Sequence, residues 1–125
     1  MKTGRWLTWI GSVILFFTGI GHATRIVHVE KLIAAGGMKA PLDLLLKVNW
    51  LAFAGEMVAL AVIAMLASAM AGGGRIVLIC GATMFVNVGI VFHFGGLSIS
   101  LYVSLVVAVL LLAGGWMQAK TAAQG

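Results

Sequence analysis

Charged residues are nearly absent from four long stretches of this 125-residue chain. Of its eight basic and three acidic residues, all but Glu56 lie at the ends of these stretches or in one connecting segment. Charged residues make up 9% of the chain, whereas a typical soluble domain has about 25%. Each stretch is long enough to cross a hydrocarbon core of about 30 Å as a helix. The sequence therefore predicts an all-α integral membrane protein with four transmembrane helices in one bundle.

Glycines divide the chain into these spans. The expected spans cover, approximately, residues 5–24, 48–71, 75–94 and 97–116, and together they form one domain over 1–125. Gly72 to Gly74 and Gly95-Gly96 supply tight turns after the second and third spans. In the second span, small residues favour close packing against neighbouring helices: Gly55, Ala59, Ala64 and Ser68.

The segment 25–47 differs in composition from the spans. It holds four basic residues, two acidic residues, Gly36-Gly37 and the only proline, Pro41. Apolar residues recur at helical spacing from Ile26 to Ile33. We therefore expect a short amphipathic helix in the membrane interface, or a re-entrant element, that ends at the two glycines.

Basic residues mark the membrane boundaries. They lie at the ends of segments, so the net charge of +5 comes from residues that flank the membrane. We therefore expect a lipid bilayer as partner and no nucleic acid. The two sides carry equal numbers of basic residues, but Lys2 and Arg5 precede the first span, which favours cytoplasmic termini in a bacterial inner membrane. Trp6 and Trp9 lie where an interfacial aromatic belt is expected. The apolar run after Arg5 is long enough for a span, so we do not expect it to be a cleaved signal.

Glu56 is the one charged residue inside a predicted span. It lies nine residues beyond Lys47, about 13 Å along a helix and close to the bilayer midplane. An ionisable side chain at this depth costs about 3 kcal/mol or more, so it faces a partner or a cavity. Asn49 lies seven residues earlier, on the same helical face. Glu56 is therefore the first candidate for a functional residue, and an interhelical hydrogen bond is the structural alternative.

Polar residues of the first and third spans could complete a site with Glu56. They recur at helical spacing, so most of them share a face of their helix. The first span contributes Thr18, His22 and Arg25, and the third contributes Thr83, Asn87 and His93. Structural alternatives are interhelical hydrogen bonding for Thr83 and Asn87, and an interfacial position for His22 and Arg25.

His22 and His93 lie on the same membrane side if their spans run in the same direction. They could share a haem or a metal, whereas His93 alone could also be a proton carrier or an interface residue. No histidine pair has the HExxH spacing, and no two carboxylates are placed for a di-metal site. We therefore expect no metal and leave the cofactor open, with haem or a quinone as candidates.

Several short patterns carry a family resemblance. The first span ends in Gly19-Ile20-Gly21-His22, the second opens on Ala54-Gly55-Glu56, and the third ends in a histidine before glycines. Together with the amphipathic segment around Gly36-Gly37 and Pro41, this layout resembles the DoxX-like family of small four-span membrane proteins, which often have a lysine where His22 stands. The resemblance implies a helper subunit associated with membrane sulfur or quinone redox systems, with Glu56 and His93 as the matching polar positions.

Three functions fit these residues. The first is an accessory or redox-associated subunit of a membrane complex, with a buried polar site around Glu56 and a lipid-facing surface that docks on a larger partner. The second is a membrane-embedded isomerase or hydrolase acting on a lipophilic small molecule, in which Glu56 donates a proton and His22 or His93 accepts one. The third is an oligomeric carrier or proton pathway lined by Glu56. The expected assembly is accordingly a homo-oligomer or a subunit of a larger complex.

Overall fold

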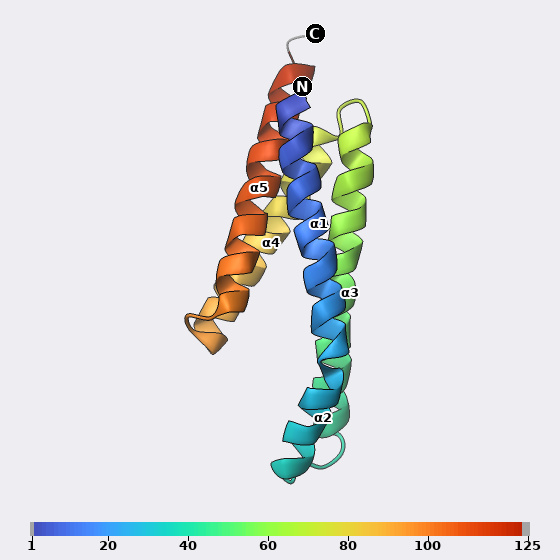
Figure 1. Ribbon diagram of the computed structural model, residues 1–125, viewed down its shortest axis with the longest axis vertical. Helices are drawn as coiled ribbons and strands as arrows, with labels where there is room; N and C mark the ends of the chain where they lie inside the picture. The colour runs from blue at the N-terminus through green and yellow to red at the C-terminus, as the bar shows by residue number, and fades with distance from the viewer. Residues whose placement is uncertain (1, 124–125) are drawn as a thin grey trace.

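The computed structural model describes residues 2–123 and consists of helices joined by short connections (Figure 1). In chain order the helices are α1 (Lys2–Thr24), α2 (Ile26–Ala35), α3 (Leu42–Ala69), α4 (Gly74–Gly95) and α5 (Ile99–Ala122). Four stretches are long and apolar enough to cross a membrane: Thr3–Ala35, Leu42–Ala69, Gly74–His93 and Ile99–Ala122. The predicted all-α bundle with four helices of membrane-spanning length is confirmed.

Glycines end the helices at the reversals of the chain. Each of the last three connections contains a glycine with a positive φ: Gly37 (66°), Gly72 (74°) and Gly96 (63°). Glycine adopts this backbone conformation without a steric penalty. At the end of α2 the Met38 N–H also donates to the Ile33 carbonyl, which closes the last turn. The turns predicted at Gly36-Gly37, Gly72 to Gly74 and Gly95-Gly96 are therefore confirmed.

The segment 25–47 divides differently from the expectation. The short helix α2 forms after a turn at Arg25, but α3 begins at Leu42, ahead of the expected start at residue 48. Pro41 precedes the first turn of α3, where a missing N–H leaves no helical hydrogen bond unmade, and Asp43 lies near the positive end of the helix dipole. As a result, α2 and the start of α3 form a hairpin that extends beyond the α4–α5 turn (Figure 1).

The long helices pack as two antiparallel pairs, α1 with α3 and α4 with α5, and α1 also lies along α5. Both termini and the α3–α4 turn lie at one end of the bundle, here called the terminal end (Figure 1). Away from it, α4 and α5 lean away from α1 and α3 (Figure 1). The helices are therefore gathered most closely in the terminal half.

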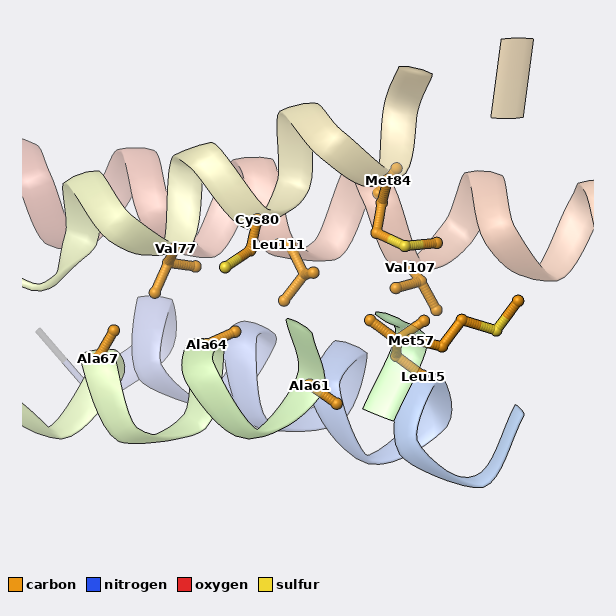
Figure 2. Packing of buried hydrophobic residues seen from close by; sticks show 11 residues of the cluster. Leu15, Met57, Ala61, Ala64, Ala67, Val77, Cys80, Met84, Val107 and Leu111 are labelled. Atoms are coloured by element: carbon orange, nitrogen blue, oxygen red, sulfur yellow. The ribbon is translucent and has the colours of Figure 1, made fainter. Parts of the chain in front are cut away.

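The buried core lies between α1, α3, α4 and α5 (Figure 2). Alanines line the core side of α3, and Ala61 and Ala64 are fully buried. Longer apolar side chains from the other helices fill the space opposite them: Leu15, Val77, Met84, Val107 and Leu111. The small side chains of α3 let its neighbours approach closely, as is typical of membrane helices.

Two adjacent glycines place α5 against two helices at once. A Cβ atom at Gly114 would lie 2.5 Å from Thr8 Oγ1 of α1, and a Cβ atom at Gly115 would lie 2.7 Å from the backbone nitrogen of Leu78 in α4. No other residue type fits at either position without a shift of the neighbouring helix. The pair Gly114-Gly115 therefore sets the distance of α5 from both α1 and α4.

Candidate functional site between helices α3 and α4

A hydrogen bond joins Glu56 to Asn87. Asn87 Nδ2 donates to Glu56 Oε1 at 3.1 Å. Each residue is about 20 Å from the end of its helix at the α3–α4 turn, at a rise of about 1.5 Å per residue. The antiparallel hairpin therefore brings the two side chains to the same depth, inside a hydrocarbon core of about 30 Å.

Glu56 lies at the surface of the bundle and not in its core, so the prediction of a buried site around it is wrong. Its side chain is exposed, whereas the next residue, Met57, is 3% exposed. Asn87 is half-buried beside Met84, which belongs to the core. The carboxyl group thus lies at the edge of the core, where a surrounding bilayer or a partner protein would contact it.

Other exposed residues lie around Glu56. Asn49, Ala52 and Ile63 are exposed and share its side of α3 by helical spacing. Together with Glu56, these residues are called the Glu56 face below. On α4, Thr83 lies one turn before Asn87 and its hydroxyl donates to the Ile79 carbonyl at 3.0 Å. Of the predicted partners in the second and third spans, Asn87 donates a hydrogen bond to Glu56.

His22 belongs to an aromatic cluster with α3. Its ring stacks on that of Trp50, with centroids 3.8 Å apart and planes at 16°, and meets the edge of the Phe53 ring at 5.3 Å. Trp50 Nε1 also donates to the His22 carbonyl oxygen at 2.7 Å. Phe53 lies one helical turn from Glu56, so this cluster adjoins the candidate acid. The contacts of the His22 ring are nevertheless with the two aromatic residues.

The other two residues predicted for the first span, Thr18 and Arg25, form no hydrogen bond with Glu56 among the residues that the structure describes. The Thr18 hydroxyl donates to the Ile14 carbonyl of its own helix at 2.7 Å. Arg25 is exposed at the turn between α1 and α2. The stripe predicted for this span is therefore formed along α1 but is not gathered around the carboxyl group.

His93 is exposed near the end of α4, about 9 Å along the helix from Asn87. The helices of His22 and His93 run in the same direction, as the hypothesis of a shared cofactor requires, but α4 leans away from α1 toward this end (Figure 1). In the part of the chain that the structure describes, no group of three or more His, Cys, Asp or Glu residues could hold a metal ion. No cofactor site is therefore assigned to these residues.

The sequence did not predict a second polar cluster, which lies at the terminal end. Gln118 Nε2 donates to Thr8 Oγ1 at 2.8 Å and also lies within hydrogen-bonding distance of the Gly4 and Gly114 carbonyl oxygens. Thr8 is fully buried and Gln118 is 9% exposed. This anchoring explains why α5 continues to Ala122, past the expected end of the span at residue 116. The one sign of this cluster in the sequence is Gln118, an amide side chain two residues after the expected end of the span.

Arg5 lies beside this cluster and contacts the end of α3. Its Nε donates to the Ser68 carbonyl oxygen at 2.8 Å, which satisfies a carbonyl of the last helical turn. A hollow of about 590 Å³ adjoins it, lined by Arg5, Ser68, residues 69–74, Gln118, Thr121 and Ala122. The sequence placed Arg5 at a membrane flank but gave no sign of this hollow.

Comparisons with known proteins supply no function to set beside this geometry. The chain matches no protein-family model, no curated protein and no solved structure. Its function is therefore inferred from the residues described above.

Proposed function

We propose that this protein is an accessory subunit of a larger complex in the bacterial inner membrane and docks on its partner through the Glu56 face. The observation that carries the proposal is an exposed carboxyl group in the middle of α3, bonded to Asn87. The resemblance to DoxX-like proteins supports a redox-associated role for the complex. Lys2 and Arg5, ahead of the first span, support cytoplasmic termini.

An exposed carboxyl group inside the bilayer is unfavourable unless another group covers it. An acidic side chain at this depth costs about 3 kcal/mol on insertion scales, whereas an interhelical hydrogen bond contributes about 0.6 kcal/mol on average. The bond from Asn87 therefore offsets only a fraction of the cost. A partner helix that donates a hydrogen bond to Glu56 would offset the rest of the cost. This hydrogen bond would therefore contribute to the free energy of docking.

The surface around Glu56 suits contact with another helix. Ala52, one turn away, is small and exposed, so a partner helix can approach the backbone of α3 closely. Ile63 is 46% exposed, and Ile90 of α4 is 52% exposed, which adds apolar area on both sides of the polar pair. The short connections between α3, α4 and α5 leave little chain outside the membrane, and this also favours a role within a membrane complex.

Site-specific photo-cross-linking in native membranes tests this proposal. A photoreactive residue at Ile63 is expected to cross-link to one partner protein of distinct mass, and the complex is expected to be larger than any homo-oligomer. The same residue at Val106, which is 53% exposed on α5, is the control and is expected to remain without that partner. If Ile63 cross-links only to lipid or to a second copy, and the protein migrates alone, the accessory role is wrong.

A charge-removing variant tests Glu56 itself. Glu56→Gln keeps the size of the side chain and an oxygen for Asn87, but it removes the charge that a partner's donor would bind. We expect about tenfold less partner to be retained on purification, which corresponds to about 1.4 kcal/mol. Glu30→Gln, which changes an exposed acid of α2, is the matched control and should retain the partner. The acid–base and carrier functions stay predictions until such variants are assayed for turnover or transport.

A further inference from the structure

We propose that the terminal end of the bundle binds one anionic phospholipid, with its phosphate at Arg5 and an acyl chain along Trp6 and Trp9. This site is distinct from the Glu56 face, since Glu56 is about 20 Å along α3 from Ala69. It is also independent of the accessory role, because a lipid can bind here whether or not a partner covers Glu56.

The proposed headgroup site is the hollow of about 590 Å³ beside Arg5. The α3–α4 turn, residues 69–74, forms one wall, and Gln118 and Thr121 of α5 contribute to the other. These residues lie at the end of the bundle where both termini are found, as Figure 1 shows. In a bilayer this level corresponds to the interface, where phospholipid headgroups lie.

Arg5 is held in place at this hollow. Its Nε donates to the Ser68 carbonyl at 2.8 Å, which ties the side chain to the end of α3. A guanidinium group has five N–H donors, so four remain on its terminal nitrogens after this bond. Two parallel N–H groups match two phosphate oxygens, and a side chain that is already positioned loses less freedom on binding.

The proposed acyl-chain site is a second hollow of about 390 Å³, lined by Arg5, Trp6, Trp9 and Ala69. Arg5 and Ala69 line both hollows, so the two adjoin. Trp6 is 67% exposed and Trp9 is 47% exposed, which leaves large aromatic surfaces open beside the arginine. A hollow lined by an arginine and an amide, next to one walled by tryptophans, fits a molecule with an anionic head and an apolar tail.

The distribution of charge favours an anionic ligand at this end. The three acidic residues of the chain lie elsewhere: Glu30 in α2, and Asp43 and Glu56 in the first and middle parts of α3. Arg75 in the first turn of α4 and Lys120 in the last turn of α5 lie at the terminal end, together with Arg5. Their combined field attracts an anion, and the hollow beside Arg5 gives that attraction a fixed position.

Native mass spectrometry of the purified full chain tests the proposal. The protein is released from mixed micelles that contain phosphatidylglycerol and phosphatidylcholine in equal amounts. We expect one phosphatidylglycerol molecule to be retained, with a Kd about tenfold below that for phosphatidylcholine. Arg5→Gln is expected to raise the Kd for phosphatidylglycerol about tenfold and to abolish the preference.

Matched variants separate a built site from diffuse attraction. Arg75→Gln removes one positive charge from the same end but lines neither hollow, so it is expected to change the Kd less than about twofold. Glu56→Gln should also leave retention unchanged. Equal weakening by Arg5→Gln and Arg75→Gln would overturn the proposal, because it would indicate only a general positive surface.

A third variant covers the case in which Arg5→Gln loses its helical fold, as judged by circular dichroism. Ala69→Leu fills the wall that both hollows share and leaves the charge unchanged, and it is expected to raise the Kd about tenfold. Unchanged binding by Ala69→Leu contradicts the proposal. Complete displacement of the lipid by millimolar inorganic phosphate also contradicts it, because the site would then bind a free anion without using the tryptophans.

Discussion

Trp50 Nε1 donates a 2.7 Å hydrogen bond to the His22 carbonyl oxygen, and the rings of the same two residues stack on each other. The His22 carbonyl, in the last turn of α1, also accepts from the Arg25 N–H at 3.2 Å, so the indole is its second donor. The bond from Trp50 therefore fixes α1 to α3 next to the point at which the chain turns into α2.

Trp50→Phe keeps an aromatic ring for His22 but removes the donor. We expect the free energy of unfolding in mild detergent to fall by about 1 kcal/mol, because a part-buried hydrogen bond between α1 and α3 is lost. Amide hydrogen exchange over residues 21–25 should become faster. Trp116→Phe, at a site that is 66% exposed, is the control and should change neither quantity. Unchanged exchange in Trp50→Phe would show that the bond does not hold this end of α1.

A double-mutant cycle on Glu56 and Asn87 measures their hydrogen bond directly. With Glu56→Ala, Asn87→Ala and the double variant, we expect a coupling of about 0.6 kcal/mol in the free energy of unfolding. Asn49→Ala is the control, because Asn49 shares the face of Glu56 but has no part in the bond. A coupling of zero would mean that the two side chains do not interact in detergent.

Gln118→Leu removes the amide that contacts Thr8 and the Gly4 carbonyl. We expect a loss of about 1–3 kcal/mol in the free energy of unfolding, because the buried Thr8 hydroxyl oxygen loses its donor, although it still donates to the Gly4 carbonyl. Adding Thr8→Val should recover a part of the loss, since both polar partners are then replaced. Thr121→Val is the control, because the Thr121 hydroxyl bonds only to the Met117 carbonyl of its own helix. A loss no greater than that of Thr121→Val would exclude a stabilising role for the cluster.

Glycine-to-alanine changes test the packing of α5. Gly114→Ala and Gly115→Ala each place a methyl group closer than 3.0 Å to atoms of a neighbouring helix. We expect each to lower the free energy of unfolding by about 1–3 kcal/mol. Gly55→Ala is the matched control, because nothing lies within 4 Å of a Cβ atom there, and alanine is the better helix former by about 0.5–1 kcal/mol. Equal effects at Gly114 and Gly55 would contradict the close approach of α1 and α5.

The helical bundle could be predicted because its determinants are local. Apolar length specifies a membrane-spanning helix, and a glycine with positive φ ends it whatever the neighbouring helices do, as Gly96 does at the end of α4. The ends of helices that leave the membrane could not be predicted in this way. Helix α3 starts at Leu42 because Pro41 and Asp43 favour a helix start there, whereas hydropathy marks only where the apolar run begins.

The sequence alone could not predict which faces of the helices pack against each other. Gly55 and Ala59 have the spacing of a close helix contact, yet both are exposed, whereas close helix approaches occur at Gly74, Gly114 and Gly115. The partner of Glu56, in contrast, could be predicted, because Asn87 is one of the polar residues expected to complete a site with Glu56, and counting from the observed α3–α4 turn singles it out. Asn87 lies as far after that turn as Glu56 lies before it, and antiparallel helices pair residues at equal distances.

The packing of α1 along α5 has a consequence for biosynthesis. Helix α1 leaves the ribosome before α5, yet Gly114 of α5 lies directly against Gly4 and Thr8 of α1. The pair of α1 and α3 can form while translation continues, but the core around Leu111 stays open until α5 has been inserted. A ribosome that stalls before α5 would thus leave the apolar side of α1 and the core residues around Leu111's position uncovered.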